Sequence, residues 1–275
     1  MEKNIDFGHV ADIYDYYANA DIDIDFFKML CKGHKNILEL MCGTGRLSKP
    51  LIEAGFPLTC VDYSEEMLEV LRKKIGVSEA GPQAASEAAS EAVSQEAPNG
   101  RLQNVEIVCQ DVCEMDLGKR FDLIIIPSNS IAEIIDQEKR RQAFRRIYKH
   151  LTSDGIFFCT LYNPPYRIKQ ADGNIRYLGK YDLEDGRTLF ITYYNVYSSA
   201  ARLITGTQFY EIYDHNRLVE KRCLDIRFSV ISKEEICKMA HEEGFTLKAI
   251  YGDYTPYHYD EASTHMNLLF QKKRR

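Results

Sequence analysis

Several features are missing from this 275-residue sequence, and each absence excludes a class of protein. No apolar run reaches the about 18 residues that a membrane-spanning helix needs, so we expect no membrane partner. Residues 1–6 contain no apolar stretch of the kind that a secretory signal requires, so we expect a cytoplasmic protein.

Basic residues are also in the minority, at 35 Lys and Arg against 41 Asp and Glu, which gives a net charge of −6. A nucleic-acid partner would favour a basic face, so we expect none. We interpret the one basic stretch, residues 272–275, as a solvated terminus.

The cysteines lack any C-x-x-C spacing and are scattered along the chain. The eight are Cys31, Cys42, Cys60, Cys109, Cys113, Cys159, Cys223 and Cys237. Several lie inside apolar segments, so we expect buried, reduced thiols rather than a disulfide framework or a zinc site. We therefore expect no bound metal.

The most informative stretch that is present is residues 36–45, Asn-Ile-Leu-Glu-Leu-Met-Cys-Gly-Thr-Gly. It predicts a strand, a glycine turn and the start of a helix, and the glycines allow a ligand to approach bare backbone. A second apolar run ends in Asp62, about 20 residues further on, where a βαβ unit places its ribose-binding carboxylate. The pair predicts a nucleoside ligand.

The details of the turn distinguish between nucleoside ligands. A dinucleotide site has the pattern G-x-G-x-x-G, but the third glycine position is Ser48 here. Glu39 precedes the turn, where it would repel a pyrophosphate but suit an ammonium group. The pattern E-x-x-C-G-T-G resembles motif I of the class I S-adenosylmethionine methyltransferases, and residues 62–68 resemble the D-x-S-x-x-M-L that continues it. The alternative is a Rossmann-like unit that binds another ligand or none.

The resemblance implies a role for each matching position. Glu39 would face the methionine amino group of S-adenosylmethionine, and Asp62 would accept hydrogen bonds from both ribose hydroxyls. Met67 would pack on adenine, and Asp111, after the third strand, would hold the adenine amino group. The complete set of expected cofactor-binding residues is Tyr14, Glu39, Cys42, Gly43, Gly45, Asp62, Tyr63, Met67, Asp111, Val112 and Pro127.

The order of apolar segments matches the fold of that family, a Rossmann-like, doubly wound α/β sheet of seven strands with an antiparallel last strand. We expect residues 36–163 and 231–275 to form this S-adenosylmethionine-binding domain, with residues 1–35 as an N-terminal lid. The low-complexity segment 78–100, with its recurring Ser-Glu-Ala unit, is expected to be an exposed, mobile insertion.

Residues 164–230 are expected to form an antiparallel β insertion. Three segments rich in Tyr, Ile, Phe and Thr, at 188–196, 202–213 and 218–230, predict a meander. Because it follows the fifth strand, it should roof the acceptor site above the strand ends, or form a homodimer interface. Tyr193 and Tyr194 must point to opposite faces.

Methyl transfer is an in-line displacement that needs an acceptor lone pair about 3–3.5 Å from the methyl carbon. Tyr14 lies in Ala11-Asp-Ile-Tyr-Asp15, which resembles the A-x-x-Y-D of many small-molecule methyltransferases. Asn129 and Tyr162 follow the fourth and fifth strands, and these three are the candidate catalytic residues. Further candidates are Tyr17, Asn163, Tyr166 and, as a base, His258.

An amine acceptor needs only a neutral lone pair, whereas a phenol or carbon acid usually needs a base. Residues 163–166, Asn-Pro-Pro-Tyr, resemble a run of nucleic-acid amino-methylating enzymes, but they follow the fifth strand instead of the fourth. The sequence therefore predicts methylation of a small molecule, with an amine preferred by resemblance to glycine and amino-sugar N-methyltransferases. The alternatives are an O-methyltransferase and a non-catalytic S-adenosylmethionine-binding regulator or partner subunit.

Overall fold

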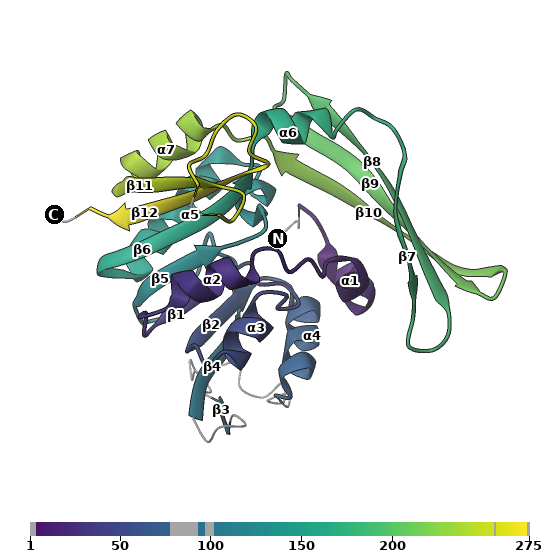
Figure 1. Cartoon of the computed structure of the whole chain (residues 1–275), viewed down its shortest axis with the longest axis horizontal. Helices are drawn as coiled ribbons and strands as arrows, with labels where there is room; N and C mark the ends of the chain where they lie inside the picture. The colour runs from purple at the N-terminus through teal and green to yellow at the C-terminus, as the bar shows by residue number, and fades with distance from the viewer. Residues whose placement is uncertain (1–3, 78–92, 97–101, 256, 274–275) are drawn as a thin grey trace.

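The computed structural model describes residues 4–77, 93–96, 102–255 and 257–273, which form a large sheet and a small sheet (Figure 1). The large sheet has eight strands in the order β11-β12-β6-β5-β1-β2-β4-β3. In chain order they are β1 (Ile37–Leu40), β2 (Leu58–Asp62), β3 (Val93–Glu96), β4 (Leu102–Cys109), β5 (Phe121–Ile126), β6 (Leu151–Tyr162), β11 (Phe245–Gly252) and β12 (His265–Lys272).

Strand directions confirm the predicted fold. Strands β4, β2, β1, β5 and β6 pair in parallel, whereas the last strand, β12, runs antiparallel between β6 and β11. The edge strand β3 was not predicted, because it comes from residues 93–96 of the low-complexity segment, where no apolar periodicity marks it. It pairs with the otherwise open edge of β4. The rest of the predicted insertion 78–100 lies outside the described residues.

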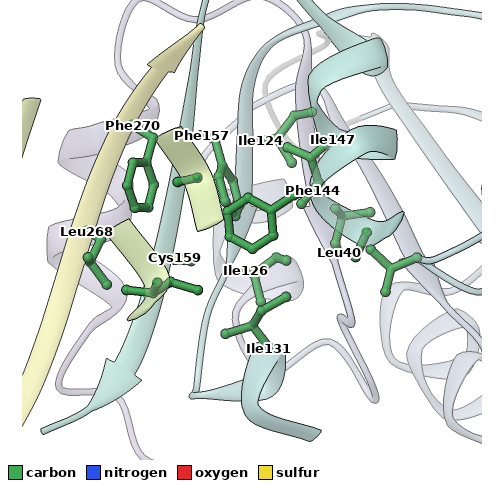
Figure 2. Close-up of a cluster of buried hydrophobic side chains, with 14 of the residues drawn as sticks. Leu40, Ile124, Ile126, Ile131, Phe144, Ile147, Phe157, Cys159, Leu268 and Phe270 are labelled. Carbon is green, nitrogen blue, oxygen red and sulfur yellow. The ribbon is translucent and has the colours of Figure 1, made fainter. Parts of the chain in front are cut away.

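Helices cover both faces of the large sheet. On one face lie α2 (Ile24–Cys31), α3 (Ser48–Glu53) and α4 (Glu65–Ile75), and on the other α5 (Gln137–His150) and α7 (Lys233–Glu242). Figure 2 shows the second interface, where Phe144 and Ile147 of α5 pack against Phe157 and Phe270 of the sheet. The Ser232 side chain caps the start of α7, since it accepts the Glu235 N–H. No helix in the described part of the chain is long and apolar enough to cross a membrane.

The small sheet consists of β7 (Arg176–Asp182), β8 (Thr188–Ser198), β9 (Leu203–Asp214) and β10 (Arg217–Ser229), in the order β10-β9-β8-β7. It follows α6 (Pro164–Lys169), and Figure 1 shows it beside the large sheet. The prediction missed β7, because Arg-Tyr-Leu-Gly-Lys-Tyr-Asp is a half-exposed edge strand with a glycine inside it. Tyr193 lies on the face of β8 that carries buried Leu189 and Ile191, and Tyr194 lies on the opposite face.

The N-terminal segment lies between the two sheets (Figure 1) and contains η1 (Phe7–Val10) and α1 (Ala11–Tyr17). Its apolar side chains join the core of the small sheet, where Ile13 packs in one cluster with Tyr210. Polar contacts reach both sides, because Asp12 pairs with Arg222 of β10 and Asp15 accepts a hydrogen bond from Thr44 of the glycine turn.

All eight cysteines are free, and five of them are buried. The expectation of burial is wrong for Cys109 and Cys223, which are exposed. Cys109 ends β4 at the rim of a cavity, and Cys223 lies on the outer face of β10. Strand membership alone does not distinguish the buried face from the exposed one.

Candidate active site

The site forms where β1, β2, β4 and β5 end, at the carboxyl edge of the large sheet. Two cavities of ≈940 and ≈270 Å³ lie there, and Met41, directly after β1, lines both. The backbone is unusual at this edge, since Met41, Ser128 and Asn129 all have positive φ values, of 58°, 59° and 64°. Such conformations cost energy in non-glycine residues, and they concentrate at functional sites.

Asp62 fixes the glycine turn. Its two carboxylate oxygens accept hydrogen bonds from the Gly43 N–H at 2.8 Å and the Ser64 N–H at 2.9 Å. Gly43 has φ of +56°, and a Cβ there would lie 3.3 Å from the Cε of Met67. Met67 is therefore buried against the turn and lines neither cavity, and its contact with adenine stays a prediction.

The larger cavity is lined by three of the residues expected at the adenosine end, Tyr63, Asp111 and Val112. One Asp111 oxygen accepts the N–H of Cys113 at 2.7 Å, which orients the carboxylate. Sequence reasoning missed Glu133, which follows β5 and lines the same cavity. Burial, and secondly the negative charge of Asp62, raise the pKa of Glu133 to about 8.

The smaller cavity contains the residues expected at the methionine end: Tyr14, Glu39, Cys42, Gly43 and Pro127. Glu39 is 1% exposed and accepts a hydrogen bond from the Ser48 hydroxyl at 2.7 Å. Burial raises the pKa of Glu39 to about 7, so the carboxyl group is poised between its two protonation states near neutral pH.

Two further residues at this end were not predicted. Arg46 directly follows the glycine turn and forms a bidentate pair with Asp23, with both N–O distances 2.6 Å. Both line the smaller cavity, together with Glu39. The donor set thus offers carboxylates for an ammonium group and a guanidinium for a carboxylate, which fits the zwitterionic amino-acid end of S-adenosylmethionine. The position of Arg46 next to the turn was the signal that could have identified it.

The smaller cavity is also lined by neutral groups, which together are called the acceptor wall below: Tyr14, Tyr162, Tyr254 and His265. Burial raises the pKa of each of these tyrosines, so none supplies a phenolate at neutral pH. Burial lowers the pKa of His265, while a hydrogen bond from its Nδ1 side to Asp253, at 3.3 Å, partly opposes that shift. His265 is therefore a neutral imidazole, and its ring centre lies 4.8 Å from that of Tyr162, with the two planes tilted by 31°.

The structure does not bring every candidate into the site. Asn129 uses its side-chain oxygen to accept the Tyr162 N–H at 2.9 Å, and it lines neither of the two cavities described above. Asn163 is fully buried and bonded to the loop before β12, so its role is structural. His258 is exposed, and Gly45, with φ of +77°, packs against the helix α4 below the turn. The positive φ at residue 129 turns its side chain away from the cavity, which sequence position could not reveal.

Two aromatic candidates lie at the margin of the site. Tyr17 forms a hydrogen bond to the hydroxyl of Tyr210 at 2.9 Å and so joins α1 to β9. Tyr166 is 38% exposed and stacks on Tyr162. Among the described residues, no group of three or more His, Cys, Asp or Glu side chains could hold a metal ion.

Comparison with known proteins agrees with this geometry. Residues 38–157 match a family described as a methyltransferase domain. A glycine/sarcosine N-methyltransferase from Aphanothece halophytica is 25% identical over 94% of this chain and 84% of its own length. A putative methyltransferase from Geobacillus is 29% identical over 46% of this chain, which spans only 41% of that relative.

Solved structures share the whole architecture. An S-adenosylmethionine-dependent methyltransferase from Clostridium acetobutylicum superimposes with a TM-score of 0.72, at 19% identity, over 97% of this chain and 99% of its own. That likeness covers both sheets, while the family match includes Glu39, Arg46 and Asp111 but not Tyr14, Tyr162 or His265. Taken with the residues at the strand ends, these findings show a methyltransferase domain over residues 38–157 and a chain that shares the fold of a solved S-adenosylmethionine-dependent methyltransferase.

Proposed function

We propose that this enzyme transfers the methyl group of S-adenosylmethionine to the amine of a small molecule. The observation that carries the proposal is the lining of the smaller cavity, where charged Asp23, Glu39 and Arg46 occur together with neutral tyrosine and histidine side chains. Its volume of ≈270 Å³ suits the end of a donor and a small acceptor rather than a macromolecule. The similarity to a glycine/sarcosine N-methyltransferase supports an amine.

On the donor side, S-adenosylmethionine supplies an electrophilic methyl group when bound. We assign Glu39 and Arg46 to its amino-acid end, because both line the smaller cavity. Asp62 would accept from the ribose, and Tyr63 with Val112 would enclose the adenine. Asp62 already fixes the turn through two backbone N–H groups, so ligand hydrogen bonds would add to an orientation that exists without the ligand.

On the acceptor side, the wall formed by Tyr14, Tyr162 and His265 would orient a neutral amine. A tyrosine oxygen and a neutral imidazole nitrogen can each accept a hydrogen bond from an amine N–H. Such acceptors direct the nitrogen lone pair without having to remove a proton from a weak acid, and positioning of this kind supplies much of the rate in displacement reactions.

A second candidate is O-methylation of a small hydroxyl compound, and one observation favours it. His265 is hydrogen-bonded to Asp253, an arrangement that can take a proton from a hydroxyl group. The amine remains the better proposal, because burial lowers the pKa of His265 and so makes it a weak base.

We propose that the two sheets have different roles. Residues 36–163 and 231–275 would bind the donor, residues 164–230 would set acceptor specificity, and residues 1–35 would close over both. We further propose a cytoplasmic location, without nucleic-acid or membrane partners, because the net charge is −6. The outer face of the β7–β10 sheet is the surface we propose for a homodimer.

The test is a panel of matched amines, phenols and carboxylic acids, with release of S-adenosylhomocysteine as the readout. We expect turnover with small amines, and loss of it when Tyr14 and Tyr162 are together replaced by phenylalanine. Preferential turnover of hydroxyl compounds would select the O-methyltransferase. Tight donor binding without turnover of any acceptor would select the non-catalytic alternative.

A further inference from the structure

The guanidinium of Arg167 is largely enclosed, and it has no carboxylate partner among the described residues. Arg167 lies on α6, where the chain leaves the large sheet for the small one. Its Cζ is 5.2 Å from the ring centre of Tyr162 and 5.8 Å from that of Phe228. Its Nε is buried and has no hydrogen-bond partner, and the described groups that affect its charge are all tyrosines.

An arrangement of this kind is costly in the absence of a ligand. A buried cation loses its hydration, and two aromatic faces replace only part of it. The other enclosed arginines differ in this respect, since Arg46 is paired with Asp23 and Arg140 lies 3.7 Å from Glu235. The guanidinium stays charged at neutral pH although burial lowers the pKa of Arg167. A bound anion would supply the negative partner that Arg167 lacks among the described residues.

The position of Arg167 indicates where that anion would come from. Tyr162 lines both the smaller cavity and the narrow space of ≈10 Å³ that Arg167 shares with Asn129. Tyr193, on the inner face of β8, is close enough to affect Arg167 electrostatically. The guanidinium thus lies across the Tyr162 ring from the methionine end of the donor site, at the junction of the two sheets.

We propose that Arg167 binds an oxyanion of the methyl acceptor, so that the substrate is an amine that also carries a carboxylate or a phosphate. The inference rests on the proposed amine methylation, because the space beside Arg167 adjoins the smaller cavity through Tyr162. The planar fork of an arginine matches either oxyanion with two parallel hydrogen bonds. The space beside Arg167 is too small for the group, so binding requires outward rotation of Tyr166, the exposed ring stacked on Tyr162.

The first test uses binding alone. The protein is saturated with S-adenosylhomocysteine, and its melting temperature is followed while amino acids, their uncharged amides and aminoalkyl phosphates are added. We expect stabilisation by amines with an oxyanion, none by the amides, and loss of the effect in Arg167→Met. Arg176→Met is the matched control, because Arg176 belongs to the same segment but is paired with Asp172 at the surface.

The second test uses kinetics with whichever acceptor is turned over. We expect Arg167→Met to raise the KM of the oxyanion-bearing amine roughly 10- to 100-fold, the usual effect of losing a charged hydrogen bond, while the affinity for S-adenosylhomocysteine is unchanged. Arg167→Lys should recover part of the loss because it restores the charge. A response to carboxylates only, or to phosphates only, identifies the source of the oxyanion.

The outcomes separate this inference from the function on which it rests. If the unaltered enzyme methylated amino acids and their uncharged amides equally well, the inference would be overturned, although amine methylation would stand. Discrimination that survives in Arg167→Met would do the same. Arg167-dependent stabilisation by oxyanions without turnover of any amine would support the anion site and refute the proposed reaction.

Discussion

Donor affinity should depend on pH through Glu39. The carboxyl group is buried beside the glycine turn, and burial raises its pKa to about 7. A ligand ammonium group favours the charged form of the Glu39 carboxyl group. Below its pKa this group must first lose a proton, and the free energy of that step weakens binding. The affinity for the donor is therefore greatest at higher pH and decreases as the pH falls through about 7.

The size of the effect follows from the same pKa. About nine-tenths of the Glu39 carboxyls are charged at about pH 8 and about one-tenth at about pH 6, given a pKa of about 7. The affinity for S-adenosylhomocysteine should therefore fall about tenfold between these pH values, or ~1.4 kcal/mol. Isothermal titration calorimetry at both pH values measures it directly.

Two controls isolate Glu39 from other titrating groups. Glu39→Gln keeps an oxygen to accept the Ser48 hydroxyl, and it should bind weakly at both pH values with little pH dependence. Glu133 also titrates nearby, but it lines the adenosine cavity. Methylthioadenosine, which lacks the amino-acid end, reports on that cavity alone. An equal pH dependence for methylthioadenosine, or an unaltered one in Glu39→Gln, would refute the assignment of Glu39 to the ammonium group.

Two further predictions concern the cavity wall and the turn. At saturating donor, the acid limb of the pH–rate profile should lie below about pH 6.5, the ordinary histidine value, because burial lowers the pKa of His265. Asp253→Asn should move this limb to still lower pH, because the carboxylate raises the pKa of His265. A limb that does not move in this variant would exclude His265. Gly45→Ala should destabilise the protein by about 1–3 kcal/mol in urea unfolding, because φ is +77° and the new Cβ would lie 2.2 Å from Leu71 Cδ1. Gly118→Ala, with φ of +65° but nothing within 4 Å, measures the backbone strain alone, and an equal loss in both variants would exclude the clash.

The donor half of the site was predictable because its residues are local in sequence. Glu39, Gly43 and Asp62 lie on one strand–turn–helix–strand unit, and parallel strands bring their carboxyl ends to a common edge. The same reasoning placed Asp111 after the third strand, and the structure finds it in the larger cavity. Met67 is buried and lines neither cavity, and sequence spacing could not show this, because a helix residue near a turn can face a ligand or the core.

The acceptor wall was only partly predictable because distant segments build it. His265 enters through β12, which pairs with β6 so that His265 lies opposite Tyr162. Those positions are about a hundred residues apart, and no local pattern joins them. The sequence drew attention to His258 instead, in a Tyr-His-Tyr run that proves to be exposed. Periodicity also gave the strands of the small sheet without showing that Arg167, before them, would be enclosed by two aromatic rings.

The helix α1 explains how the two halves form one site. A helix of seven residues is marginal by itself in water, so its position depends on its tertiary contacts. Those contacts reach the donor turn through Asp15 and Thr44, and the small sheet through Tyr17 and Tyr210, which are 193 residues apart. Tyr14 directly precedes Asp15 on this helix and lines the smaller cavity. If donor binding moves the turn, we therefore expect Asp15 to transmit that movement to the Tyr14 ring, which would couple donor and acceptor binding through α1.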